Sequence, residues 1–378
     1  MQGPLQFITG YIAFRHENPS THDVEDFLLL YDFFCAPEIE EEIADSIRKL
    51  TASSSWTKII FIGGREMNRI MRRRYADSIQ SLQARIGCDF FDDIFVCRDY
   101  LGHGSPLLLN SYPTARKVAY GDSLGLVGQR EAIESTNPKP AITDRLRQLA
   151  RQLLLGQPEQ IDFDAAILPL PMDVSGRYFS KIDLIVPPKK HVRACVEQIY
   201  SGLPDLHLYC KELCEAGGKG EKHLYLLSNL SASGLTTAIS ELELYTDVIE
   251  NGTPKGATVY LKPHPRSTFE ILNNLVKRLK DDYNVILVDD KKFARVPIEL
   301  WNSLVENCDV KAIFSTSAIN LKYLYDMTVE MPLTNSQVAE YLFPSAVEHI
   351  NLTYNMIHES LQNLDNWGGQ TPLWCAKI

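Results

Sequence analysis

The chain has 378 residues, of which 45% are hydrophobic and 23% charged, with a formal net charge of −10. This composition is that of a globular protein long enough for two domains with proper cores. The acidic balance excludes bulk attraction to nucleic acid, so no nucleic-acid partner is expected. No apolar run approaches the roughly 18 residues of a membrane helix, and no signal peptide is visible, which predicts a cytoplasmic protein.

Strand and helix patterns alternate through the first half, as is typical of a parallel sheet with crossover helices. The predicted strands are 27–34, 58–62, 93–97 and 117–120, and the predicted helices are 37–50 and 66–86. The run Arg72-Arg73-Arg74 is interpreted as a solvated helix face.

The second half repeats this alternation after Val186-Pro187-Pro188, where a proline pair ends a strand-like run. Its predicted strands are 223–227, 258–261, 284–288 and 310–314, and its predicted helices are 235–249, 269–282, 298–306 and 336–367. The fold class is therefore α/β, with two doubly wound Rossmann-like domains, 1–186 and 187–378, facing a central cleft.

Two turns of the second half combine into one candidate phosphate site. The first is Lys262-Pro263-His264-Pro265, and the second is Ser315-Thr316-Ser317. Each follows a predicted strand and precedes a predicted helix, and Ser267 with Glu270 has the spacing of a capping box. Helix N-termini at the carboxyl ends of strands favour anions. Each turn alone could be only a turn or a cap, but the two together favour a ligand site.

One turn of the first half carries an acid. Gly121-Asp122-Ser123 follows a predicted strand, so the Asp122 carboxylate could accept a proton from a substrate hydroxyl. The alternative is an ordinary aspartate turn. A metal site is not predicted, because the close pair Cys210 and Cys214 fits no standard zinc spacing.

Taken in order, these pieces resemble bacterial sialyltransferases of the two-domain GT-B type, above all the polysialyltransferase-like families. Gly121-Asp122-Ser123 stands for the family's acidic motif, His264-Pro265 for its His-Pro motif, and Ser315-Thr316-Ser317 for its hydroxyl pair. Pro297-Ile298-Glu299 resembles the segment whose glutamate holds the ribose. The opening Gly3-Pro4-Leu5-Gln6 resembles the loop after the family's first strand, and that strand is almost missing here.

The resemblance implies a metal-independent, inverting transfer of sialic acid or a related nonulosonate from a CMP-sugar to a glycan or glycolipid hydroxyl. No further cofactor is implied. Asp122 would be the general base, and His264 would stabilise the leaving phosphate. The resemblance also implies peripheral contact with the cytoplasmic face of the inner membrane, and C-terminal helices that pack back toward the first domain. The donor nucleotide would be bound by Lys262, His264, Pro265, Glu299, Ser315, Thr316 and Ser317.

One departure from the family leaves alternatives open. The family's base occupies the first acidic position of its motif, where this chain has Gly121. Either Asp122 is the base from a shifted turn, or the donor sugar differs, as in transferases that use CMP-Kdo. Another GT-B enzyme that uses a UDP- or GDP-sugar, and a non-catalytic sugar-nucleotide binder, also fit the pattern.

Overall fold

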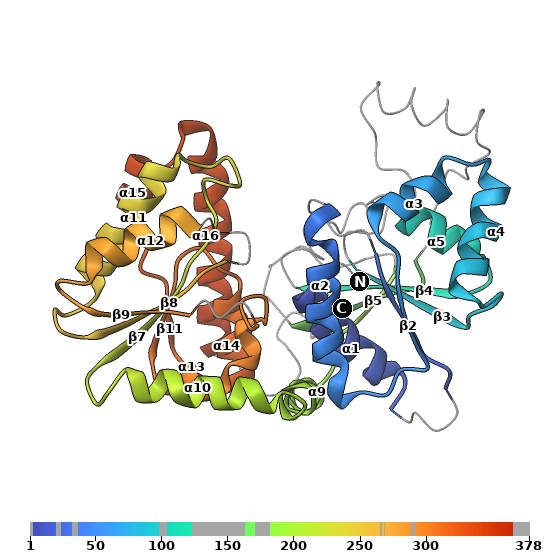
Figure 1. The fold of residues 1–378 in the computed structure, drawn as a ribbon, viewed down its shortest axis with the longest axis horizontal. Coiled ribbons are helices and arrows are strands. Elements are labelled where there is room, and N and C mark those ends of the chain that lie inside the picture. Colours follow the sequence, from blue (N-terminus) through green and yellow to red (C-terminus); the bar gives the residue numbers. More distant parts are fainter. Residues whose placement is uncertain are drawn as a thin grey trace. The chain divides into compact units, whose positions relative to one another are not determined.

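The computed structural model describes residues 3–19, 24–31, 37–97, 104–122, 163–170, 182–264, 267, 269–288 and 292–365. The chain divides into two compact units, Met1–Gly202 and Leu203–Ile378 (Figure 1). This division falls after helix α9 (Lys189–Ser201), which contacts α1 (Pro4–Glu17) of the first unit, and not at the proline pair before α9. The predicted division into 1–186 and 187–378, and the return of the C-terminal helices toward the first domain, stay predictions.

The first unit is built from parallel strands with intervening helices. Strand β1 pairs with β2, and β3, β4, β5 and β6 pair in that order. Besides α1 and α9, its elements are β1 (Phe27–Leu30), α2 (Pro37–Leu50), η1 (Thr51–Ser53), β2 (Lys58–Phe61), α3 (Gly64–Met71), α4 (Tyr75–Ile86), β3 (Asp93–Cys97), α5 (Ser105–Ser111), β4 (Arg116–Asp122), β5 (Ala165–Leu170) and β6 (Asp183–Ile185).

Helix α1 replaces the loop that was predicted at the start of the chain. Pro4 occupies its first turn, where a missing N–H costs nothing. Every residue from Phe7 to Ala13 is buried, so the helix has no polar face. A helix buried on all sides lacks the periodic pattern by which a surface helix is recognised.

The predicted helix 66–86 is two helices, α3 and α4. The three arginines are exposed, as predicted, but they form the break between the two helices, because Arg74 is extended, with φ −59° and ψ 147°. The Ser78 hydroxyl donates to the Ile70 carbonyl at 2.9 Å and to the Arg74 carbonyl at 3.1 Å, which fastens the two helices together.

The second unit holds one five-stranded parallel sheet in the order β11-β10-β7-β8-β9. Helices lie on both sides of this sheet (Figure 1), so the predicted α/β class is confirmed. Its elements are α10 (Pro204–Ala216), β7 (Lys222–Leu226), α11 (Ala238–Gly252), β8 (Thr258–Lys262), α12 (Phe269–Leu279), β9 (Asn284–Leu287), η2 (Ile298–Leu300), α13 (Asn302–Val305), β10 (Asp309–Ala312), α14 (Ser317–Tyr325), β11 (Val329–Glu330), α15 (Asn335–Tyr341) and α16 (Pro344–Asp365).

The predicted tail helix 336–367 is also divided, because Pro344 begins α16 after α15 has ended at Tyr341. Among the described helices, none combines the length and the apolar character needed to cross a bilayer.

Candidate functional site

The two predicted turns of the second unit flank one strand. Strand β7 pairs with β8 on one side and with β10 on the other, and all three strands are parallel. The chain runs outward from β7 through β8 to β9 and then returns to β10 on the other side, so the strand order reverses at β7. Ligands of open α/β sheets bind at such a reversal, outside the carboxyl ends of the strands. The predicted turns lie two strand spacings apart, about 10 Å, which suits a ligand that touches both.

The turn after β10 holds a backbone conformation that side chains rarely adopt. Phe314 has φ +55°, in the left-handed region, directly before Ser315. Such strain costs about 1–3 kcal/mol and is concentrated at ligand sites. The Ser317 N–H donates to the Ser315 hydroxyl at 3.3 Å, and α14 begins at Ser317. A serine-rich turn at a helix N-terminus presents hydroxyls and N–H groups to an anion.

Ser228, in the loop after β7, holds this strained turn in place. Its hydroxyl lies 2.5 Å from the Ile313 carbonyl and 2.8 Å from the Phe314 carbonyl, and the residue is buried. The sequence analysis assigned Ser228 no role, because the bond to Phe314 spans 86 residues of chain.

The turn after β8 is tied to the same residue. The Ser267 N–H donates to the His264 carbonyl at 2.8 Å, and the Ser267 hydroxyl donates to the Ser228 carbonyl at 3.3 Å. The described part of α12 begins at Phe269, and the Ser267 hydroxyl donates to a neighbouring loop, so the capping box of Ser267 and Glu270 stays a prediction. His264 is half-buried, while Pro265 lies outside the described residues.

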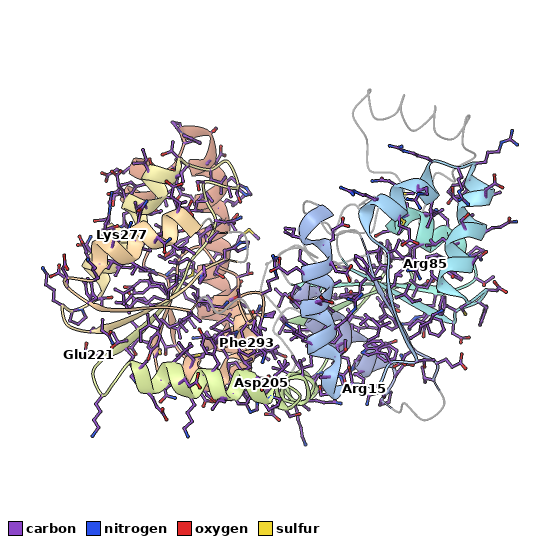
Figure 2. All side chains as sticks on the ribbon, viewed as in Figure 1. Arg15, Arg85, Asp205, Glu221, Lys277 and Phe293 are labelled. Atoms are coloured by element: carbon purple, nitrogen blue, oxygen red, sulfur yellow. The ribbon has the colours of Figure 1, made fainter. Side chains whose placement is uncertain are left out.

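Lys262 is buried at the end of β8, and its side chain contacts other residues of the second unit. Its ammonium donates to the Ala294 carbonyl at 2.9 Å and lies 5.0 Å from the centre of the Trp301 ring. Phe293 stacks on Tyr209 with ring centres 5.4 Å apart and extends this aromatic cluster. Phe293 is labelled in Figure 2. Lys262 thereby fastens β8 to the segment that leads into η2.

Glu299, in η2, connects that segment to the serine turn. Its Oε1 accepts from the Ser317 hydroxyl at 3.1 Å and from the Asn320 side-chain amide at 2.6 Å. The Tyr325 hydroxyl donates to the Glu299 carbonyl, and Glu299 is only 1% exposed. The structure therefore brings Glu299 and Ser317 together as the sequence order suggested, and the contact of Glu299 with a ribose stays a prediction.

A second buried carboxylate organises the loop after β7. Glu241 Oε1 accepts from the Leu230 N–H at 3.0 Å, and Oε2 accepts from the Ser231 N–H at 2.9 Å. The Tyr245 hydroxyl lies 2.6 Å from Glu241 Oε1 and 2.8 Å from the Ser228 carbonyl. Burial, and then the Glu241 charge, raises the pKa of Tyr245 well above its usual value, so the phenol stays a donor. The sequence contained a signal for the burial of Glu241, since this residue lies on the same helix face as the buried Tyr245 and Val248.

The candidate base belongs to the first unit. Asp122 is the last residue of β4, after the buried Gly121. Asp122 pairs with Leu170 after a register shift that follows Tyr120. Such irregularities change the direction of the side chains beyond them. The side chain of Asp122, and all of Ser123, lie outside the described residues.

Within the described ranges, no group of three or more His, Cys, Asp or Glu side chains is placed to hold a metal ion.

Residues 163–331 match the family model for alpha-2,8-polysialyltransferase. The chain is a glycosyltransferase of the sialyltransferase type. The resemblance seen in the sequence is confirmed, and the matched stretch contains the two turns and Glu299, whereas Asp122 precedes it. No curated protein sequence matches this sialyltransferase-type chain.

Two solved structures are similar to this sialyltransferase-type chain. One is the GT-B domain of a sialyltransferase from Photobacterium damselae, with a TM-score of 0.45 and 12% identity over 93% of this chain and 94% of that chain. The other is the N-terminal domain of trehalose-6-phosphate phosphatase from Candida albicans, with a TM-score of 0.35 and 13% identity over 97% of this chain and 93% of that chain. Both TM-scores lie below 0.5.

Proposed function

We propose that this enzyme transfers sialic acid from a CMP-sugar to a glycan hydroxyl, with inversion at the anomeric carbon and without a metal ion. The observation that supports a nucleotide-sugar donor is the arrangement at β7, where the His264 turn and the strained serine turn flank one strand. The family match over both turns supports sialic acid as the sugar.

In this proposal the second unit binds the leaving group. As the glycosidic bond breaks, negative charge grows on the CMP phosphate. His264, the Ser315 hydroxyl and the N-terminus of α14 supply hydrogen bonds and a positive dipole end to that charge. Glu299 keeps Ser317 and Asn320 in place beside the phosphate.

The first unit supplies the base in this proposal. Asp122 takes the proton of the acceptor hydroxyl as the new C–O bond forms, and that oxygen attacks the face opposite CMP. The acceptor is a glycan or glycolipid, reached through peripheral contact with the cytoplasmic face of the membrane.

A binding and turnover panel tests the proposal. CMP and CMP-sialic acid should raise the melting temperature, because they bind the native state, whereas UDP and GDP should have little effect. Turnover of CMP-sialic acid on a glycan acceptor should continue in excess EDTA, and the product's anomeric configuration, read by NMR, should be opposite to the donor's. Stronger stabilisation by UDP or GDP, or CMP binding with no transfer to any acceptor, would contradict the proposal.

A further inference from the structure

A series of buried hydrogen bonds leads from α11 to both ligand turns of the second unit. Glu241 and Tyr245 lie one helical turn apart on α11, and they are only 2% and 1% exposed. The Tyr245 hydroxyl lies 2.6 Å from Glu241 Oε1 and 2.8 Å from the Ser228 carbonyl. Ser228 bonds to the turns after β8 and β10. The phenol therefore connects a buried carboxylate to the residue that joins the two turns.

Glu241 is held in place by donors of the loop after β7. It accepts from the Leu230 N–H at 3.0 Å and from the Ser231 N–H at 2.9 Å, and the Ser231 hydroxyl also donates to it. A buried charge is costly unless such hydrogen bonds compensate it, and bonds to a charged acceptor are the stronger ones. Because these donors belong to the loop, the carboxylate fastens the first turns of α11 to the chain that leaves β7.

The phenol of Tyr245 transmits this fixed position to Ser228. Its oxygen lies between the carboxylate and the Ser228 carbonyl, within hydrogen-bond distance of both. The Ser228 carbonyl also accepts from the Ser267 hydroxyl, but at the longer distance of 3.3 Å. Loss of the phenol oxygen would leave the carbonyl with this longer bond, so Ser228 would be held less firmly.

The position of Ser228 matters because the turn after β10 is strained. The Ser228 hydroxyl donates to the carbonyls of Ile313 and Phe314, and Phe314 has φ +55°. A strained conformation persists only where the surrounding structure determines it. A displaced Ser228 would lengthen the bonds to both turns at once, and hydrogen-bond donors that are displaced from their ligand bind it less well.

We propose that Tyr245 is a positioning residue of the donor site: its phenol, oriented by Glu241, fixes Ser228 and, through Ser228, the two turns that bind the nucleotide. Tyr245 belongs to the buried core of the second unit, so it acts on nucleotide binding through other residues and touches no substrate. Because it names a residue that prepares the same nucleotide site, this inference rests on the proposed function.

Tyr245→Phe tests the proposal, because it removes the phenol oxygen and keeps the ring in the core. The matched control is Tyr225→Phe. Tyr225 is also fully buried, and its hydroxyl lies 2.7 Å from Thr253 Oγ1, which follows the opposite end of α11. Calorimetry measures the Kd for CMP, urea unfolding measures stability, and steady-state kinetics measures the KM of the CMP-sugar and of the acceptor.

Tyr245→Phe should raise the Kd for CMP and the KM of the CMP-sugar by about two- to tenfold, the equivalent of one lost hydrogen bond. The KM of the acceptor should not change. Tyr225→Phe should lower stability as Tyr245→Phe does, but it should leave the Kd and both KM values unchanged. An unaltered CMP affinity in Tyr245→Phe, or an equal loss of affinity in the two variants, would overturn the proposal.

A double-mutant cycle tests whether Tyr245 acts through Ser228. In a Ser228→Ala background, Tyr245→Phe should raise the Kd for CMP by a smaller factor than in the unmodified protein, and fully additive effects would overturn the proposal. Failure of the proposed function is recognised separately. If the unmodified protein binds UDP or GDP and not CMP, the CMP assignment is wrong, and the same comparison is made with the nucleotide that binds. Binding of none of the three would overturn both proposals.

Discussion

Glu299 Oε1 accepts the Ser317 hydroxyl at 3.1 Å, although the two residues are 18 positions apart in the chain. The same oxygen accepts the Asn320 amide, so one buried carboxylate determines how α14 begins. We expect Glu299→Ala to leave the buried Asn320 amide and the half-buried Ser317 hydroxyl without this acceptor, and to cost about 1–3 kcal/mol for the buried donor. Urea unfolding measures this loss, and Glu299→Gln is the matched control, because it keeps an oxygen acceptor. Equal stability of the Ala and Gln variants would contradict this role.

Ser228→Ala should weaken nucleotide binding, because Ser228 acts on the nucleotide through the serine turn and not through a contact of its own. Loss of the hydroxyl leaves Phe314 in a strained conformation with one restraint fewer, and we expect a loss of about 1–3 kcal/mol of stability. Calorimetry should show a higher Kd for CMP. Ser233→Ala, at an exposed serine of the same loop, should change neither quantity. An unaltered CMP affinity in Ser228→Ala would mean that the serine turn does not depend on this bond.

His264→Ala should lower turnover by about 10²–10³, the usual cost of one transition-state donor. The change lies at a half-buried turn, so the fold should survive. Steady-state kinetics and circular dichroism measure the two effects, and His358→Ala, at an exposed histidine of α16, is the matched control. A folded and fully active His264→Ala enzyme would leave His264 with a structural role only.

Asp122→Asn should keep CMP binding and reduce transfer by about 10²–10⁴, the size of a general-base contribution. Asp183→Asn, at an exposed position of β6, should change neither. Joint loss of CMP binding and stability would make Asp122 a turn residue. Unchanged transfer would direct the search to Asp99 and Asp173, which lie outside the described residues.

His191 should make the native state less stable in mild acid. Burial, more than the charges of His16 and Arg15, lowers the pKa of His191 below its usual 6.5. The unfolded chain then takes up this proton first, so stability is lost as the pH falls from about 6.5 toward the folded-state pKa. His191→Gln should flatten the pH dependence of the melting temperature between pH 7.5 and 5. A slope equal to that of the unmodified protein would exclude His191 as its source.

Local pattern was enough to predict elements that carry their own boundary signals. Strand 93–97 and helix 37–50 were predicted with the bounds that the structure has, because alternation and a charge gradient mark them. The positions of the His264 and Ser315 turns also followed from the sequence, since each comes directly after a strong strand pattern.

The remaining features depend on contacts that no local window contains. Ser228 acts on a turn 86 residues away, and the Ser267 hydroxyl reaches the Ser228 carbonyl 39 residues away. Helix α1 was missed because burial on every side removes the periodicity that marks a helix. Here the contacts with residues distant in the chain, and not the residue types themselves, determine the local structure.

Ser228 also limits how the donor preference of this enzyme can change. Its hydroxyl supports the turn after β10 and its carbonyl accepts from the turn after β8, so one residue joins both walls of the site. Libraries that randomise either turn alone should yield mostly inactive clones, because each new turn must still fit the unchanged one. Variation at the neighbouring, half-buried Asn229 does not break these bonds. We expect altered nucleotide choice to arise there first, in the laboratory and over evolutionary time.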